Sequence, residues 1–483
     1  MPFKSMSAMP RLALAAVALA SLAACANFSG ITPQAQMQVQ PQPATVAGAS
    51  DVAQVDAEWW HGFADPQLDR LVTQALDGSP SLKLAQARLR RAQAATDSAR
   101  SATLPQVGAE AQAMRQLYTA NGQYPAPLAG GNYNSGTVQL TTSWELDFFG
   151  KNRAALDAAL GQVQAAQADT QAARVLLVSQ VARSYFQLLR LNGQLELANR
   201  TLAQRNELLS LVRDRVNAGL DTRLELNQSQ GSLPEARQQI EALNEQIALA
   251  RNGLSALVGQ PNAADTLILP ALAAIKIKAN AQAIPADLLG RRADITAARW
   301  RVEAASADAR SAKAQFYPNV SLNGFAGFSS IGLGNLLHAG SEQWGIGPAI
   351  HLPIFDAGRL RAGLTAKTAD LDAAVESYNA ALIDAVRDVA DQITSQQFIA
   401  RQQTEQRAAQ QAAEAAYEIA VQRYSAGLGN YLNVLTSETA VLAQRRLQVD
   451  LAARALDTHV ALVRSLGGGY SASATETIAS TAY

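Results

Sequence analysis

Residues 215–220 read Arg-Val-Asn-Ala-Gly-Leu, and residues 423–428, which lie 208 positions further on, read Arg-Tyr-Ser-Ala-Gly-Leu. Gly150-Lys151 and Gly358-Arg359 are separated by the same offset. Residues 98–107 (Ser-Ala-Arg-Ser-Ala-Thr-Leu-Pro-Gln-Val) match residues 311–320 (Ser-Ala-Lys-Ala-Gln-Phe-Tyr-Pro-Asn-Val) at an offset of 213. Three matches in one order indicate two structural repeats of about 210 residues.

Both repeats follow one plan. A helical run ends near Leu104 or Tyr317, directly before a proline. Two stretches of period-2 alternation come next, followed by a very long helical hairpin. The predicted strands run from Val107 to about Tyr118, from Gly136 to Phe148, from Val320 to Phe328 and from Gln343 to Ile354. The predicted hairpin helices span 151–217 and 224–257 in the first repeat, and 358–425 and 432–466 in the second.

Two prolines fall inside these elements. Pro234 lies within the second helix of the first hairpin and should kink that helix or mark a local break. Pro348 lies within the last predicted strand, where a missing N–H suggests a bulge or a local edge.

The predicted strands are apolar on one side and polar on the other. In the clearest strand, Val138, Leu140 and Trp144 alternate with Thr137, Gln139 and Thr141. Such strands fit a transmembrane barrel, with a soluble sandwich covered by helices as the alternative. Four strands cannot close a barrel, and open edges in lipid leave backbone groups unpaired. The pattern therefore predicts an α+β membrane protein in which several copies share one barrel.

The N-terminus reads as a targeting segment. Lys4 and Arg11 precede a short apolar run, residues 12–22, that is too short to span a bilayer. The run ends in Leu-Ala-Ala-Cys25, which resembles a bacterial lipobox, so we expect acyl chains such as palmitate on Cys25. Ala26, which is not the Asp associated with inner-membrane retention, favours the outer membrane.

The domain organisation follows from the targeting segment and the repeats. We expect a signal peptide (1–24), a lipidated N-terminal tether (25–57), repeat 1 (58–258), a linker (259–284), repeat 2 (285–469) and a disordered tail (470–483).

Composition and motifs argue against several classes of function. The 483 residues carry 40 basic and 40 acidic side chains, so the formal net charge is zero and gives no general attraction to nucleic acid. The four His residues have no ligand-like spacing, and neither a nucleophile elbow nor a phosphate loop is present. We therefore expect no enzyme, no catalytic residue, no metal and no cofactor other than the lipid on Cys25. A lipid-anchored coiled-coil envelope scaffold remains an alternative.

A set of anchors spread over residues 25–469 carries a family resemblance. The chain resembles the TolC-like outer-membrane efflux channels, and specifically their NodT-like lipoprotein branch. The anchors are Trp59-Trp60-His-Gly-Phe63-Ala-Asp65-Pro66-Gln-Leu68, Asp287-Leu-Leu-Gly-Arg291-Arg292-Ala-Asp294-Ile295, Pro353-Ile354-Phe355-Asp-Ala-Gly358-Arg359, Arg423-Tyr424-Ser-Ala-Gly427-Leu428 and Gly467-Gly-Gly469.

The resemblance implies a homotrimer with a shared twelve-stranded β-barrel, four strands per chain, that continues into a long periplasmic α-helical barrel. It implies the outer-membrane component of an RND-type tripartite pump, which passively conducts drugs or small toxic molecules. The implied partners are a periplasmic adaptor, an inner-membrane transporter and outer-membrane lipid. A duct for secreted proteins is the alternative.

The resemblance also assigns roles to residues. The adaptor-contact tips fall on Gly219-Leu220 and Gly427-Leu428. Each Gly also simply permits the turn, and each Leu could pack it. Candidates for contacts that close the periplasmic entrance are Glu225, Arg423 and Tyr424.

Acidic residues mark two further stretches. Relatives often carry Asp residues at the entrance, but the matching positions here are the uncharged Asn433 and Thr436, which leaves ion selectivity open. Asp384, Asp388 and Asp391 share one helical face, and we expect either carboxylates that face the lumen or a solvated outer face.

Overall fold

The computed structural model describes residues 27–38, 55–276 and 292–470. Cys25 and the signal peptide lie outside the described residues, as do parts of the expected tether and linker and nearly all of the expected tail. The chain divides into two compact units that cut across the sequence repeats. The strand unit combines 88–167 and 297–379 with the N-terminal segment, and the helical unit combines 38–87, 168–296 and 380–483.

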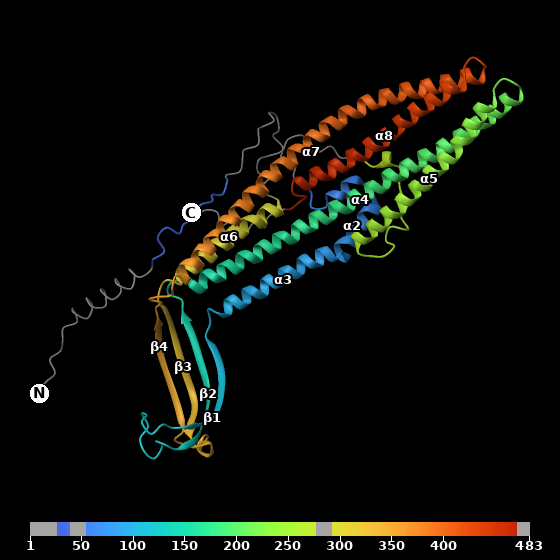
Figure 1. Cartoon of the computed structure of the whole chain (residues 1–483). Helices are drawn as coiled ribbons and strands as arrows, with labels where there is room; N and C mark the ends of the chain where they lie inside the picture. Colours follow the sequence, from blue (N-terminus) through green and yellow to red (C-terminus); the bar gives the residue numbers. More distant parts are fainter. Residues whose placement is uncertain (1–26, 39–54, 277–291, 471–483) are drawn as a thin grey trace. The chain divides into compact units, whose positions relative to one another are not determined.

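The strand unit holds one antiparallel sheet of four strands in the order β1-β2-β3-β4 (Figure 1). Each repeat contributes one hairpin, and β2 pairs with β3 where the repeats meet. All four predicted strands are therefore confirmed. Their bounds are β1 Gln106–Leu117, β2 Asn132–Leu146, β3 Asn319–Ile331 and β4 Glu342–His351.

The register separates a polar from an apolar face. Thr141 lies between Gly108 of β1 and Phe325 of β3, and residues directly opposite share a face. Large apolar side chains on the other face, such as Leu140 and Trp344, are exposed in a single chain. Pro348 lies in β4, an edge strand of the single chain, and pairs with Leu322 in an uninterrupted ladder, so the bulge expected as one possibility is absent.

Long helices connect to this sheet. The model confirms the predicted hairpin helices within one or two residues: α4 Lys151–Asn217, α5 Arg223–Val258, α7 Arg359–Ser425 and α8 Tyr431–Ser465. Shorter helices precede the strands of each repeat, α3 Pro80–Ser101 before β1 and α6 Ala293–Ala314 before β3.

The predicted break at Pro234 is absent, because α5 continues through the proline. Leu233 and Ala236 are buried on either side of Pro234. The guanidinium of Arg205 on α4 donates to the carbonyl of Ser232 at 2.8 Å. A proline inside a helix costs about 3 kcal/mol through the lost backbone hydrogen bond and the clash of its ring together, and packing against a neighbouring helix offsets that cost.

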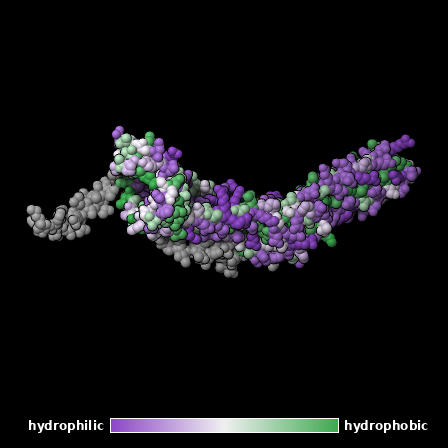
Figure 2. All heavy atoms as spheres, turned by 90° about the horizontal axis from the view of Figure 1, so that it is seen from below, coloured by the Kyte–Doolittle hydropathy of each residue, from purple (hydrophilic) through white to green (hydrophobic). Residues whose placement is uncertain are grey.

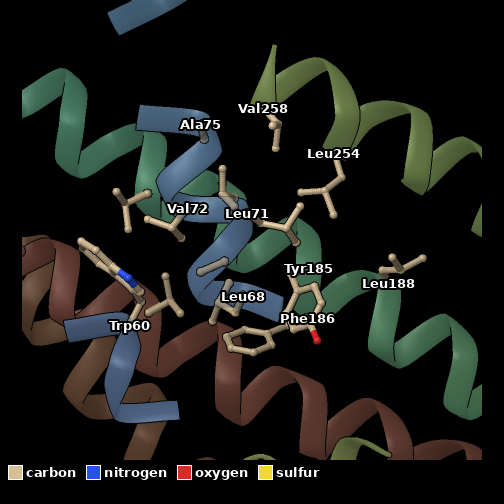
Figure 3. Close-up of a cluster of buried hydrophobic side chains, with 14 of the residues drawn as sticks. Trp60, Leu68, Leu71, Val72, Ala75, Tyr185, Phe186, Leu188, Leu254 and Val258 are labelled. Carbon is tan, nitrogen blue, oxygen red and sulfur yellow. The ribbon is translucent and has the colours of Figure 1, made fainter. Parts of the chain in front are cut away.

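The core of the helical unit forms around α2, Pro66–Gly78, which follows the 3-10 helix η1, Trp59–Phe63. Asp65 caps α2 and also accepts a 2.5 Å hydrogen bond from the hydroxyl of Tyr185 on α4. Figure 3 shows buried side chains of α2 packed between those of α4 and α5, namely Leu68, Leu71, Val72, Tyr185, Phe186, Leu188, Leu254 and Val258.

The surfaces of the long helices are mostly polar. Hydrophilic residues cover most of the helical surface visible in Figure 2, with isolated hydrophobic residues between them. Within the described ranges, no helix is both long enough and apolar enough to span a bilayer.

Candidate functional site at the hairpin tips

Both long hairpins turn with the same backbone geometry. Gly219 and Gly427 adopt left-handed conformations with φ of 74° and 77°, which glycine tolerates without strain. After each glycine a leucine N–H bonds back to an arginine carbonyl, Leu220 to Arg215 at 2.9 Å and Leu428 to Arg423 at 2.7 Å. This is a Schellman motif, and it explains why Gly recurs at the matching position of the two repeats.

The tip leucines expose most of their surface. Leu220 is 65% exposed and Leu428 is 70% exposed. One helical turn further on, Leu224 and Leu432 are 62% and 61% exposed. Figure 1 shows both turns at the same end of the helical unit, so this end carries four exposed leucines. Most of the surface of each tip leucine is therefore available to a partner, and this is compatible with a role of the Gly-Leu pair in the turn.

A side chain caps the helix that follows each tip. Thr222 and Glu225 form a capping box at the start of α5, where the Glu225 carboxylate accepts from the Thr222 N–H at 2.9 Å. Hydrogen bonds from Thr222 lower the pKa of Glu225. Asn430 caps α8 by accepting from the Asn433 N–H at 3.0 Å. Glu225 therefore stabilises its own helix.

A polar cluster joins the two hairpins behind the tips, and we call Arg215, Asp221 and Tyr424 the tip lock. Arg215 makes a bidentate ion pair with Asp221, with N–O distances of 2.9 and 3.2 Å. The same guanidinium donates to the Tyr424 carbonyl at 2.9 Å and lies 4.5 Å from the centre of the Tyr424 ring. The Tyr424 hydroxyl donates to Asp221, so Arg215 from one hairpin and Tyr424 from the other share one carboxylate.

Burial and hydrogen bonding shift the pKa values of the tip lock. The hydrogen bond from Arg215 lowers the pKa of Asp221, and the same bond raises the pKa of Arg215. Burial, together with the bond to Asp221, raises the pKa of Tyr424 well above its usual value. At neutral pH the carboxylate is charged and the phenol is protonated, which is the state that these bonds require.

An apolar cluster supports the tip lock. The Tyr424 side chain is fully buried and packs near Tyr431 of α8, with ring centres 5.8 Å apart. Side chains from α4, α7 and α8 make up this cluster: Leu208, Val212, Tyr424, Tyr431 and Val434.

Of the three predicted entrance residues, only Tyr424 lies in the contact between the hairpins. Arg423 is exposed and donates to the Leu428 carbonyl of its own turn at 3.3 Å. Arg215 and Asp221 also lie in this contact, and neither was among the predicted entrance residues. Arg215 belongs to the repeated motif, and Asp221 stands where the second repeat has Gly429, so a departure from the repeat was the available signal.

The predicted acidic face of α7 carries ion pairs. Asp384 pairs with Arg387 at 3.1 Å. Asp388 lies 3.6 Å from Arg387 and 3.9 Å from Arg292, and Asp391 is exposed. Asn433 and Thr436 are also exposed. In the part of the chain that the structure describes, no cluster of His, Cys, Asp or Glu could hold a metal ion.

Comparison with known proteins places this architecture among outer-membrane channels. The family model described as "Outer membrane efflux protein" matches residues 71–260 and 284–468. The fusaric acid resistance protein FusA of Burkholderia cepacia is 38% identical over 74% of this chain and 69% of its own length. The pyoverdine export outer membrane protein OpmQ of Pseudomonas putida is 32% identical over 94% of this chain and 96% of its own.

Solved structures agree with this placement. The outer membrane protein VceC of Vibrio cholerae superposes with a TM-score of 0.82 at 38% identity, covering 86% of this chain and all of that one. The outer-membrane channel OprN superposes with a TM-score of 0.80 at 28% identity, covering 90% of this chain and 99% of that one.

Proposed function

Because the chain belongs to the outer membrane efflux protein family, it is an outer-membrane channel and not an enzyme, and we propose that it conducts drugs or other small toxic molecules out of the cell. The names of its relatives support this cargo class, since one relative confers resistance to fusaric acid and another exports pyoverdine. Passage through such a duct is passive, so an inner-membrane transporter supplies the energy.

The sheet supports a channel shared by three copies. In one chain β1 and β4 are open edges, and a strand edge in lipid leaves backbone N–H and C=O groups unpaired at several kcal/mol each. Three copies of a four-stranded sheet close into twelve strands without an edge. The apolar face, with exposed Val107, Leu140, Ile346 and Ile350, then faces lipid, and the polar face lines the duct.

The N-terminal segment supports a lipid anchor at Cys25. Within the strand unit the Phe28 ring lies 5.9 Å from the ring of Phe316, just before β3. Arg361 of α7 donates to the Asn27 carbonyl at 2.7 Å. Residues two and three positions after Cys25 are therefore held where the helices meet the strands. Acyl chains on Cys25 would enter the membrane beside the barrel.

The tips support contact with a periplasmic adaptor protein. Leu220, Leu224, Leu428 and Leu432 are exposed, apolar and placed at one end, and apolar patches of this kind mark protein contacts. Behind them the tip lock connects the hairpins of one chain. We propose that this contact keeps the periplasmic entrance closed. Of its three residues, Tyr424 is the one that the sequence predicted.

A Cys25→Ser variant, exported normally, tests the channel itself. We expect a trimer of about three times 51 kDa that requires detergent, because the strands rather than the lipid cross the bilayer. A folded, water-soluble monomer would overturn the proposal.

Paired tip variants test the adaptor contact. Leu220→Ser with Leu428→Ser should lower resistance to pump substrates while the outer-membrane trimer remains normal in amount. Leu249→Ser, an exposed leucine of α5 away from the tips, serves as the control. Full resistance in the double variant would show that the tip leucines are not needed for contact with the adaptor.

A further inference from the structure

One carboxylate on the polar face of the sheet belongs to a row of side chains that crosses the strands. Glu110 of β1, Gln139 of β2, Gly327 of β3 and Gln343 of β4 lie opposite one another in the ladder. The Gln343 amide donates to the Gln139 carbonyl oxygen at 2.9 Å, and the Gln139 amide donates to Glu110 at 3.3 Å. Both amides are thereby oriented with donors towards Glu110.

Gly327 makes this row possible. A Cβ on Gly327 would lie 2.5 Å from the Gln139 Cα and 2.7 Å from the Gln139 Cβ. The absent side chain lets Gln139 reach across β3 to Gln343. The neighbouring row of paired residues on the polar face has small residues at both ends, Gly108 in β1 and Gly345 in β4. The Phe325 ring lies over Gly345 and thus towards the opposite edge of the sheet from Glu110. No bulky side chain covers the carboxylate, and Glu110 is exposed.

Glu110 differs from the other ionisable groups on this face. The polar face of β1–β4 carries Glu110, Glu145 and His351. Lys151 neutralises Glu145 with an N–O distance of 2.6 Å. Among the residues that the structure describes, Glu110 has no cation within ion-pair distance, and its bonded neighbour is the neutral Gln139 amide. Its charge therefore stays uncompensated.

We propose that three Glu110 side chains form a carboxylate ring in the barrel lumen that favours organic cations over anions of similar size. The inference rests on the proposed shared barrel. A threefold axis places the three copies at one height whatever the register between neighbouring subunits. Rings of Asp or Glu give cation preference in other channels. The effect is moderate here, because salt screens charges over about 8 Å at physiological ionic strength.

A reporter cysteine beside the ring tests this inference. Thr141 lies on the same face, two residues from Gln139 towards the helical end of the strand, so Thr141→Cys places a thiol next to Glu110. Whole cells are treated with cationic or anionic methanethiosulfonate reagents of similar size, and the two modification rates are compared. We expect the cation-to-anion rate ratio to fall about threefold when Glu110→Gln is added, and to fall further with Glu110→Lys.

Glu342→Gln is the matched control, because it removes the same charge from the opposite face of the sheet and should leave the ratio unchanged. An unchanged ratio in Glu110→Gln, with the thiol still reactive, would overturn the carboxylate ring alone. A thiol at position 141 that reacts with neither reagent until the membrane is dissolved would instead overturn the shared barrel and its polar lumen. Trimer amounts in the outer membrane confirm that each variant is assembled.

Discussion

The two hairpin tips have the same backbone conformation, but their arginine side chains make different contacts. Arg215 and Arg423 occupy the same position before the turn glycine, and the backbone carbonyl of each accepts the N–H of the leucine that follows its own glycine. Arg215 is nearly buried and holds Asp221 and the Tyr424 carbonyl, whereas Arg423 is exposed and reaches only its own turn. The difference comes from two substitutions between the repeats, Asp221 against Gly429 and Val216 against Tyr424.

This contrast shows that the two repeats share the turn and differ in the residues that make the tip lock. Each repeat supplies part of it: the first brings the ion pair, and the second brings the aromatic ring and its hydroxyl. The ion pair within the first tip also contacts the second hairpin, through the Tyr424 carbonyl and, because residue 424 is a tyrosine, through its ring and hydroxyl.

The largest effect is expected from Asp221→Ala. This change leaves the Arg215 guanidinium, 10% exposed, without its carboxylate and removes the acceptor of Tyr424. Breaking a buried pair from one side costs about 3 kcal/mol. We expect amide hydrogen exchange of the tip residues to accelerate about a hundredfold and a large antibiotic to leak in. Arg423→Ala, the matched control, should change neither quantity.

Acid should weaken the tip lock next most strongly. The pKa of Asp221 is lowered in the folded state, so its contribution is fully present above the unfolded value of 3.8 and is lost as pH falls through the folded value. Tip exchange, corrected for its intrinsic rate, should be constant from pH 5 to 8 and rise below pH 3.8. Asp221→Asn should abolish this component of the rise, and a rise that begins as high as pH 6 in the wild type would contradict the assignment.

A smaller effect is expected from Tyr424→Phe. The ring stays packed and remains available to the Arg215 guanidinium, and only the hydroxyl bond to Asp221 is removed. A hydrogen bond to a charged group contributes about 1.5–3 kcal/mol, so tip exchange should rise at least about tenfold. Leak of the large antibiotic should lie between those of the wild type and Asp221→Ala. Leak equal to the wild type would remove the hydroxyl from the gate.

The smallest effect is expected from Gly429→Asp, which gives Arg423 the partner that Arg215 has. A Cβ at position 429 meets its nearest atoms at 3.5 Å, so the side chain fits. Exposed ion pairs contribute less than about 1 kcal/mol. A double-mutant cycle with Arg423→Ala should give a coupling in that range. A coupling near 3 kcal/mol would show that sequence alone, without burial, makes the lock.

Sequence by itself determined the elements and their order. Period-2 alternation located β1–β4, and the long proline-free run and the repeated Arg-Gly-Leu motif located α4, α7 and both turns. These signals are local: a strand alternates faces every residue, and a left-handed turn favours glycine, whatever surrounds them. Of the kink or break expected at Pro234, the break does not occur, because α5 packs against α4, a contact that is not local in sequence.

Only the tertiary structure decided which side chains meet. Asp221 and Tyr424 are 203 residues apart and come together because the hairpins pack side by side. The same holds for Glu110, Gln139 and Gln343, whose row depends on strand register and on the space above Gly327. Contacts of this kind depend on packing across the whole fold, and no period within either segment encodes them. The sequence therefore predicts a channel with two similar tips. The packing of the two hairpins then brings Tyr424 to Arg215 and Asp221 and so forms the tip lock.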